Sequence, residues 1–231
     1  MSRVIVIELV SLDGVMQDPD GSEGSGPGGW AFRYGPEAVA GDKFNLGEVL
    51  DTGTLLLGRR TWQLFATIWP GRDDEFSAKM NAIPKLVASR SLDRATGWQN
   101  STVLAGDLVA TVRERKQAHD IVVAGSASIV RALMDHDLVD EYRLLVFPLV
   151  LGAGERLFRD GITPIDLTLV SAQTAGPAVR LSYARQAQSG AVTEPYQARD
   201  QNVPSCISGV FSRSPLVICG SVVHKPVDNS G

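Results

Sequence analysis

Arginine, serine and glycine residues that could bind a phosphate follow three apolar segments of the chain. The segments are LLLGRRT at 55–61, LVASR at 86–90 and IVVAGSAS at 121–128. The first and third lead directly into a helical pattern, so a helix N-terminus with unpaired backbone N–H groups should lie at each turn. Such N-termini attract anions, and Arg59, Arg60 and Arg90 add positive charge beside the strand ends. The pattern indicates a site for a phosphorylated nucleotide.

The residues predicted to contact this nucleotide all lie at the ends of those segments. They are Gly58, Arg59, Arg60, Thr61, Ser89, Arg90, Gly125, Ser126, Ala127 and Ser128. Each also has an ordinary structural explanation: a glycine that closes a strand, a serine that caps a helix, or a solvated arginine. The Gly125–Ser128 turn lacks the full G-x-G-x-x-G pattern and is therefore not a Rossmann fingerprint.

Strand and helix patterns alternate along the chain. Strands are predicted at 4–10, 54–57, 84–89, 102–105, 120–124, 141–148, 166–173 and 178–185. Helices are predicted at 37–50, 60–68, 107–117 and 127–134, with Asp107 as an N-cap. This order predicts an α/β fold in three layers: a mixed, mostly parallel sheet with helices on both faces and a C-terminal β-hairpin. Ligands of such sheets bind beyond the carboxyl ends of the strands.

Two segments depart from this alternation. The loop at 11–35 contains DPDGSEGSGPGG and is far longer than the usual connection of about 4–6 residues, so we expect it to be functional or mobile. Trp30 in this loop could stack on a planar ring or anchor the loop to the core. Residues 188–231 are rich in Ser, Pro and Gly, and we interpret them as a disordered or loosely attached tail after a domain at 1–187.

Composition excludes several classes of protein. The 231 residues carry a net charge of −4 without Lys/Arg blocks, which argues against a nucleic-acid partner. No apolar run reaches the roughly 20 residues of a membrane span, and the N-terminus lacks a signal-peptide pattern. Both cysteines lie beyond residue 200, and the three histidines show no metal-ligand spacing. We therefore expect a cytoplasmic protein without a metal site.

Four motifs in order resemble the dihydrofolate-reductase-like superfamily. They are SLDG at 11–14, GRRTW at 58–62, AGSAS at 124–128 and LLVFPLVLGAGERLF at 144–158. The resemblance covers residues 1–187 and is closest to stand-alone relatives of the reductase domain of bacterial riboflavin-biosynthesis deaminase-reductases. The chain has no H-x-E with P-C-x-x-C, so the zinc deaminase half of those enzymes is missing.

The resemblance implies NADPH as the cofactor. It places the adenosine end of NADPH at the Gly58 turn and the pyrophosphate at the Gly125 turn. It places Arg90 near the 2′-phosphate, and Leu151 and Gly152 near the nicotinamide. Asp13 and Trp30 become candidate catalytic residues beside the nicotinamide and substrate, although Asp13 could equally be a turn former.

The function implied is an NADPH-dependent reductase of a small heterocyclic or ribosylated substrate. The most similar reaction is reduction of 5-amino-6-(5-phosphoribosylamino)uracil in riboflavin biosynthesis. The alternatives are a dihydrofolate or pteridine reductase, and a non-catalytic nucleotide-binding protein of the same fold. The expected partners are a small-molecule substrate and a second copy of the chain, as a homodimer. The sequence identifies no proton donor, since Glu37 and Asp42 lie in no matching motif.

Overall fold

The computed structural model describes residues 2–186, so the predicted tail at 188–231 lies outside the described residues. The described residues form one eight-stranded sheet of order β4-β3-β2-β5-β1-β6-β8-β7. Its strands are β1 Val4–Ser11, β2 Thr54–Gly58, β3 Lys85–Ala88, β4 Ser101–Val103, β5 Ile121–Val123, β6 Glu141–Phe147, β7 Leu167–Ala175 and β8 Ala178–Arg185. All eight match strands predicted from the sequence to within a few residues.

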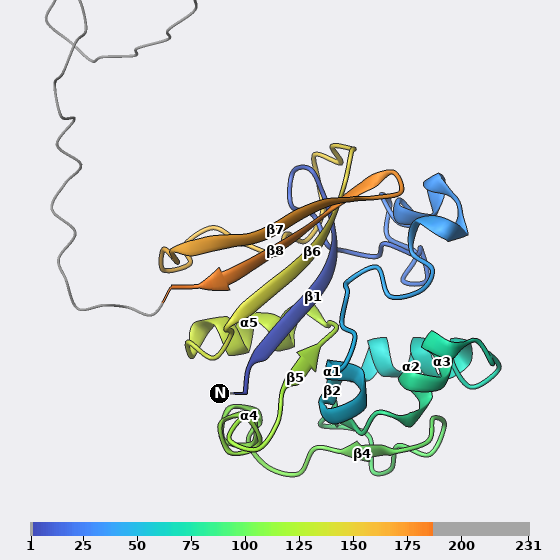
Figure 1. Cartoon of the computed structure of the whole chain (residues 1–231), viewed down its shortest axis with the longest axis vertical. Helices are drawn as coiled ribbons and strands as arrows, with labels where there is room; N and C mark the ends of the chain where they lie inside the picture. The colour runs from blue at the N-terminus through green and yellow to red at the C-terminus, as the bar shows by residue number, and fades with distance from the viewer. Residues whose placement is uncertain (1, 187–231) are drawn as a thin grey trace, which may run out of the picture. The chain divides into compact units, whose positions relative to one another are not determined.

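Strand β1 lies in the middle of the sheet, between β5 and β6, and is parallel to both (Figure 1). Its continuous apolar run VIVIELV fits this position, because a central parallel strand is covered on both faces. The pairs from β4 to β6 are all parallel, whereas β8 pairs antiparallel with β6 and β7. The predicted mixed sheet with a closing hairpin is therefore confirmed.

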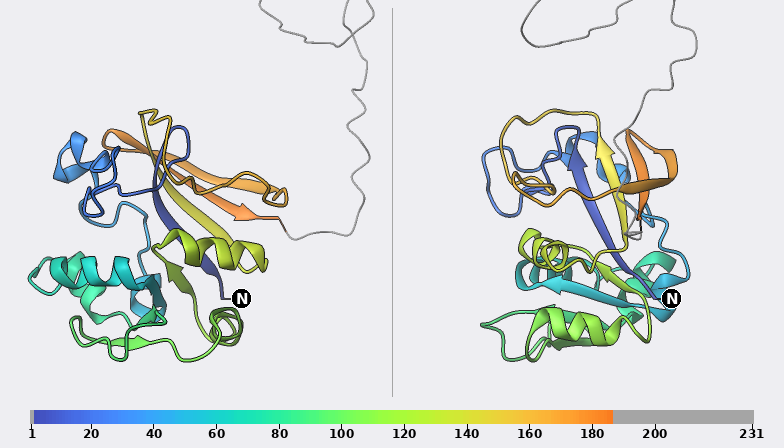
Figure 2. Two further views of the ribbon diagram at one scale, coloured as in Figure 1. Left: turned by 180° about the vertical axis from the view of Figure 1, so that it is seen from behind. Right: turned by 90° about the vertical axis from the view of Figure 1, so that its left-hand side faces the viewer.

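Helices cover both faces of the sheet (Figure 2). They are α1 Val49–Thr52, α2 Arg59–Ile68, α3 Glu75–Ala82, α4 Leu108–Arg115 and α5 Ala127–Asp135, with short 3-10 turns at Ala31–Tyr34 and Pro36–Ala38. Trp62 of α2 packs in one apolar cluster with Ile5 of β1, and Leu133 of α5 packs in another with Val4. Successive residues of β1 thus serve opposite layers, as the alternation of side chains along a strand requires.

The predicted helix at 37–50 is wrong. Only a 3-10 turn and the four-residue α1 lie in or beside this range, because Gly41, Asn45 and Gly47 all have positive φ angles. A right-handed helix cannot contain such residues. Asp42 accepts hydrogen bonds from the backbone N–H groups at 46 and 47, at 2.8 and 2.9 Å, and stabilises a turn instead. The structure adds α3, which the sequence analysis did not predict.

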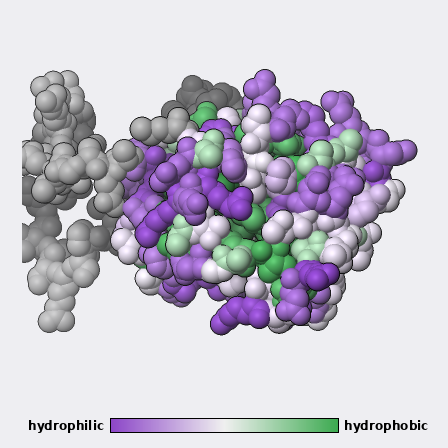
Figure 3. Space-filling view, turned by 90° about the horizontal axis from the view of Figure 1, so that it is seen from below, coloured by the Kyte–Doolittle hydropathy of each residue, from purple (hydrophilic) through white to green (hydrophobic). Residues whose placement is uncertain are grey.

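The surface is mixed in polarity. In the view from below, hydrophobic surface forms a limited central area bordered by hydrophilic side chains (Figure 3). Leu169 and Val170 on the edge strand β7 are 53% and 62% exposed. No helix within residues 2–186 has the length and apolar character needed to cross a membrane.

Candidate functional site

Gly58 and Gly125 lie side by side where the connections that follow two neighbouring strands lead to opposite faces of the sheet. Strands β2 and β5 are neighbours, but the connection from β2 leads to α2 on one face and that from β5 leads to α5 on the other. Gly58 donates its backbone N–H to the Gly125 carbonyl at 3.1 Å. A Cβ atom on Gly58 would lie 2.6 Å from Ser126 Oγ, so only glycine permits this approach. Ligands of α/β sheets bind in the crevice at such a switch point.

The helices that begin at this point lack side-chain caps. Gly58 and Ser126 are the N-cap residues of α2 and α5, and neither caps its helix through a side chain. By contrast, Asp74 and Asp107 accept hydrogen bonds from the first turns of α3 and α4, at 3.0 and 2.8 Å. The two uncapped N-termini therefore offer N–H groups and positive dipole ends to an anion.

A cavity of about 1390 Å³ opens at this edge of the sheet. Every nucleotide-contact residue predicted from the three strand ends lines it: Gly58, Arg59, Arg60, Thr61, Ser89, Arg90, Gly125, Ser126, Ala127 and Ser128. Pockets that hold one drug-sized ligand measure about 300–1,000 Å³. This cavity therefore has room for a dinucleotide and a second, smaller molecule.

The arginines concentrate positive charge at one end of the cavity. Arg59 and Arg60 follow β2, and Arg90 follows the neighbouring strand β3. Arg59 donates to the neutral amide of Gln63 at 3.2 Å, and Arg60 is 73% exposed and 3.9 Å from Glu23. An exposed pair at this distance is weak, so the guanidinium groups are available to a phosphate.

Glu8 is a cavity residue that sequence reasoning missed. It lies on β1 and lines the cavity, and its Oε1 atom is buried without a hydrogen-bond partner. A Cβ atom on Gly125 would lie 3.8 Å from this oxygen. Burial raises the pKa of Glu8 to about 8, and the nearby Gly125 backbone N–H offsets part of this rise. The available signal was a single acidic residue inside the apolar run VIVIELV.

Asp13 serves as a connection between two loops and does not line this cavity. Its Oδ1 atom accepts from Ser11 Oγ at 2.7 Å and from the Leu151 N–H at 3.1 Å, and its Oδ2 atom accepts from the Gly152 N–H at 2.9 Å. These bonds hold the pKa of Asp13 well below its usual range, with the Ser11 hydroxyl as the largest cause. Leu151 and Gly152 also lie outside the cavity lining, and their contact with a nicotinamide stays a prediction.

Trp30 is fully buried and lies outside the cavity lining. Its ring packs edge-on against Phe147, with centroids 5.6 Å apart. Its Nε1–H group donates to the Gln17 carbonyl at 2.9 Å. The structure therefore matches the anchoring alternative for Trp30 and leaves no ring face for a substrate.

The glycine-rich loop is organised around the buried carboxylate of Asp18. This carboxylate accepts from the Glu23 and Ser25 N–H groups at 2.9 and 2.8 Å and from Ser25 Oγ at 2.9 Å. A Cβ atom on Gly28 would lie 2.3 Å from Asp18 Oδ2, so the loop needs glycine there. Asp18, Asp20 and Glu23 place this loop in the cavity wall.

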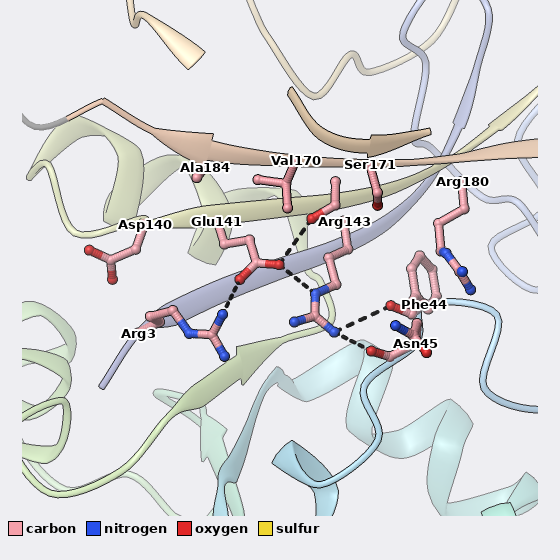
Figure 4. Close-up of a pocket in the computed structure, with 11 residues that line it drawn as sticks. Arg3, Phe44, Asn45, Asp140, Glu141, Arg143, Val170, Ser171, Arg180 and Ala184 are labelled. Carbon is pink, nitrogen blue, oxygen red and sulfur yellow. Dashed lines mark hydrogen bonds and ion pairs between the residues drawn. The ribbon is translucent and has the colours of Figure 1, made fainter. Parts of the chain in front are cut away.

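A smaller cavity of about 290 Å³ is lined by residues of β6, β7 and β8 (Figure 4). Its Glu141 carboxylate accepts from Arg3 and Arg143, each at 2.7 Å. Arg143 also donates to the carbonyls of Phe44 and Asn45. Two arginines thus compensate the charge of Glu141, and the bonds from Arg143 hold the segment that carries Phe44 to the large cavity.

Comparison with known proteins agrees with this geometry. The family model described as the RibD C-terminal domain matches residues 2–181. The chain is 28% identical over 197 residues to the uncharacterized protein YwjB of Bacillus subtilis, covering 80% of this chain and 99% of YwjB. It is also 28% identical over 180 residues to the uncharacterized protein YyaP of the same organism, covering 74% of this chain and 88% of YyaP.

Solved structures show the same fold. A putative riboflavin biosynthesis protein from Shewanella sp. PV-4 aligns with a TM-score of 0.62 at 19% identity, covering 80% of this chain and 99% of that one. Acinetobacter baumannii RibD aligns with a TM-score of 0.52 at 16% identity, covering 80% of this chain and 58% of the RibD chain.

Proposed function

The chain belongs to the RibD C-terminal domain family, and we propose that it is an NADPH-dependent reductase of a small heterocyclic or ribosylated substrate. The observation that carries this proposal is the pair of uncapped helix N-termini that meet inside one large cavity. A pyrophosphate needs such a cluster of backbone N–H groups. We further propose a cytoplasmic location, since residues 1–187 contain no cysteine that a disulfide would need.

The residues present fit a nicotinamide dinucleotide. The first turns of α2 and α5 would hold the pyrophosphate, because their backbone N–H groups lack side-chain caps at the switch point. Arg59, Arg60 and Arg90 would bind the 2′-phosphate of the adenosine end. When bound, NADPH supplies a hydride to a polarised carbon of the substrate.

The rest of the cavity would position the substrate and exclude water. Met16 and Gln17 enter its wall from the loop after β1, and Phe44 and Leu46 enter from the irregular segment after the 3-10 turns. The apolar side chains of Met16, Phe44 and Leu46 favour a planar ring over water. By family, the first substrate to test is 5-amino-6-(5-phosphoribosylamino)uracil.

Equilibrium binding of NADPH and NADH to the whole chain tests the cofactor assignment. NADPH should bind at least tenfold more tightly, a difference of about 1.4 kcal/mol. Arg59→Ala, Arg60→Ala or Arg90→Ala should narrow that difference. Arg113→Ala, which removes the same charge from an exposed position on α4, should leave it unchanged. Equal affinities for the two cofactors in the unsubstituted protein would refute the 2′-phosphate site.

Turnover separates a reductase from a nucleotide-binding protein of the same fold. We expect NADPH oxidation with the ribosylaminopyrimidine or a related heterocycle in preference to dihydrofolate. Tight NADPH binding without reduction of these compounds or of a panel of small carbonyls and imines would favour the non-catalytic alternative.

A further inference from the structure

Few groups in the large cavity can donate a proton near neutral pH. Among the described residues, its lining contains no His, Cys, Lys or Tyr. Its acidic residues are Glu8, Asp18, Asp20, Glu23, Glu37 and Glu155. Its other charged groups are Arg59, Arg60, Arg72 and Arg90. A proton donor must therefore come from the six carboxyl groups or from water.

The five carboxyl groups other than Glu8 are either held by hydrogen bonds or open to solvent. The hydrogen bonds to Asp18 lower its pKa, so it is ionised. The side chains of Glu23 and Glu155 are 43% and 42% exposed, and Asp20 and Glu37 also reach solvent. Only Glu8 combines a buried oxygen that has no partner with a position on the cavity wall.

The order of strands places Glu8 on the side of the Gly125 turn away from the arginines. Along the sheet edge, Arg90 follows β3, Arg59 follows β2, Gly125 follows β5, and Glu8 lies on β1. A dinucleotide with its pyrophosphate between β2 and β5 and its 2′-phosphate at the arginines would extend its other end toward β1. Neighbouring strands are about 4.8 Å apart, so Glu8 lies about one strand beyond the pyrophosphate turn.

We propose that Glu8 is the proton donor of the reduction, an inference that rests on the proposed reductase function. The carbon of the substrate's C=N or C=O bond takes the hydride from NADPH, and its nitrogen or oxygen takes the proton from the Glu8 carboxyl. The O–H electron pair stays on Glu8 as a carboxylate, and a proton from water restores the acid before the next turnover. The net reaction consumes NADPH and one proton and yields NADP⁺ and the reduced substrate.

The surroundings of Glu8 favour its neutral form at the start of each cycle. Burial raises its pKa to about 8, so most of the protein carries the acid at pH 7. The phosphates of a cofactor held at Gly125 would add negative charge nearby, which disfavours the carboxylate further. An acid with a pKa near the working pH is the most effective donor.

The test combines the wild-type chain with Glu8→Gln, Glu8→Asp and the matched control Glu114→Gln on the exposed side of α4. Difference infrared spectroscopy of wild type against Glu8→Gln should show a neutral carboxyl band that disappears with a midpoint near pH 8. NADP⁺ affinity should change less than threefold. Single-turnover reduction of the ribosylaminopyrimidine, or of whichever panel compound wild type reduces, should slow at least 100-fold in Glu8→Gln at pH 7.

The rate of wild type should fall tenfold per pH unit above about pH 8, and Glu8→Gln should lack this dependence. Glu8→Asp should recover part of the rate, and Glu114→Gln should keep all of it. A carboxyl band that titrates near pH 4–5, or an unchanged rate in Glu8→Gln, would overturn the role of Glu8 while the reductase function stands. A wild type that binds no NADP⁺ or reduces nothing would overturn both proposals.

Discussion

Trp30 holds the long loop to the sheet through two contacts of different kinds. Its ring packs on Phe147, and its Nε1–H group satisfies the Gln17 carbonyl. Trp30→Ala should therefore lower the free energy of unfolding by about 3–5 kcal/mol, because it removes both. Trp30→Phe keeps an aromatic ring there and should cost less. Urea unfolding measures the free energy of unfolding of both variants. The NADPH affinity of each folded variant should stay within about threefold of the wild-type affinity.

A catalytic Trp30 would give the opposite pattern. Turnover would then fall in both variants while the unfolding free energy stayed close to that of wild type.

Glu8 should also make stability depend on pH. Burial raises its pKa to about 8 in the folded protein from the ordinary glutamate value of 4.5, so between these values the folded state holds a proton that the unfolded state has released. The Glu8 contribution is therefore complete below about pH 4.5 and is lost as pH rises toward 8. Relative to Glu8→Gln, wild type should lose up to about 1.4 kcal/mol of unfolding free energy per pH unit in this window.

Urea unfolding of both proteins from pH 5 to pH 9 measures the difference. A difference that stays constant across the window would show that Glu8 is ionised when folded.

The sequence predicted the positions of some site residues and not of others. The Gly58 and Gly125 turns were predicted because a strand end and a helix start adjoin in sequence. Asp13 could not be placed, because two of its partners lie 138 and 139 residues away. Glu8 was missed because a lone acid in an apolar run does not show whether its face opens to a cavity. Local patterns reveal turns, whereas long-range contacts decide what a polar side chain does.

At the scale of elements, the turn between β5 and α5 should tolerate no side chain at Gly125. Its φ angle is +69°, and a Cβ atom would lie 3.1 Å from Thr61 Oγ1. Gly125→Ala should weaken NADPH binding at least tenfold and cost about 1–2 kcal/mol of stability. Gly161→Ala is a matched control, because its φ is +78° with nothing within 4 Å of the added carbon.

Gly161→Ala should lose comparable stability and keep its NADPH affinity. If both variants bound NADPH like wild type, Gly125 would have only a packing role.

The strands were predicted better than the helices for a physical reason. Buried parallel strands are short runs of β-branched and aliphatic residues, and such runs leave few alternatives. The segment at 37–50 has apolar residues at helical spacing, but Gly41 and Gly47 allow a backbone that buries Leu46 without a helix. Helix α2 was predicted correctly because no glycine or proline interrupts its apolar face.

At the scale of the whole molecule, the site depends on strand order. Helices α2 and α5 lie on opposite faces, and their N-termini meet only because β5 lies beside β2 despite 62 residues between Gly58 and Ile121. The sequence predicted the alternating elements and the residues at the edge where the large cavity opens. It could not predict that Glu8 on β1 would adjoin the Gly125 turn, because neighbouring strands are set by the packing of all elements together.

The part of the chain proposed to bind NADPH should function without residues 189–231. Every residue that lines the large cavity lies between Ile7 and Glu155, and the last described strand, β8, ends at Arg185. A chain that ends at Gln188 should therefore keep the melting temperature and NADPH affinity of the full chain, and limited proteolysis of the full chain should cut first beyond residue 188. Lower solubility or weaker NADPH binding of the shortened chain would instead show that residues 189–231 contribute to the sheet or to a partner, and the predicted boundary at residue 187 would have to move.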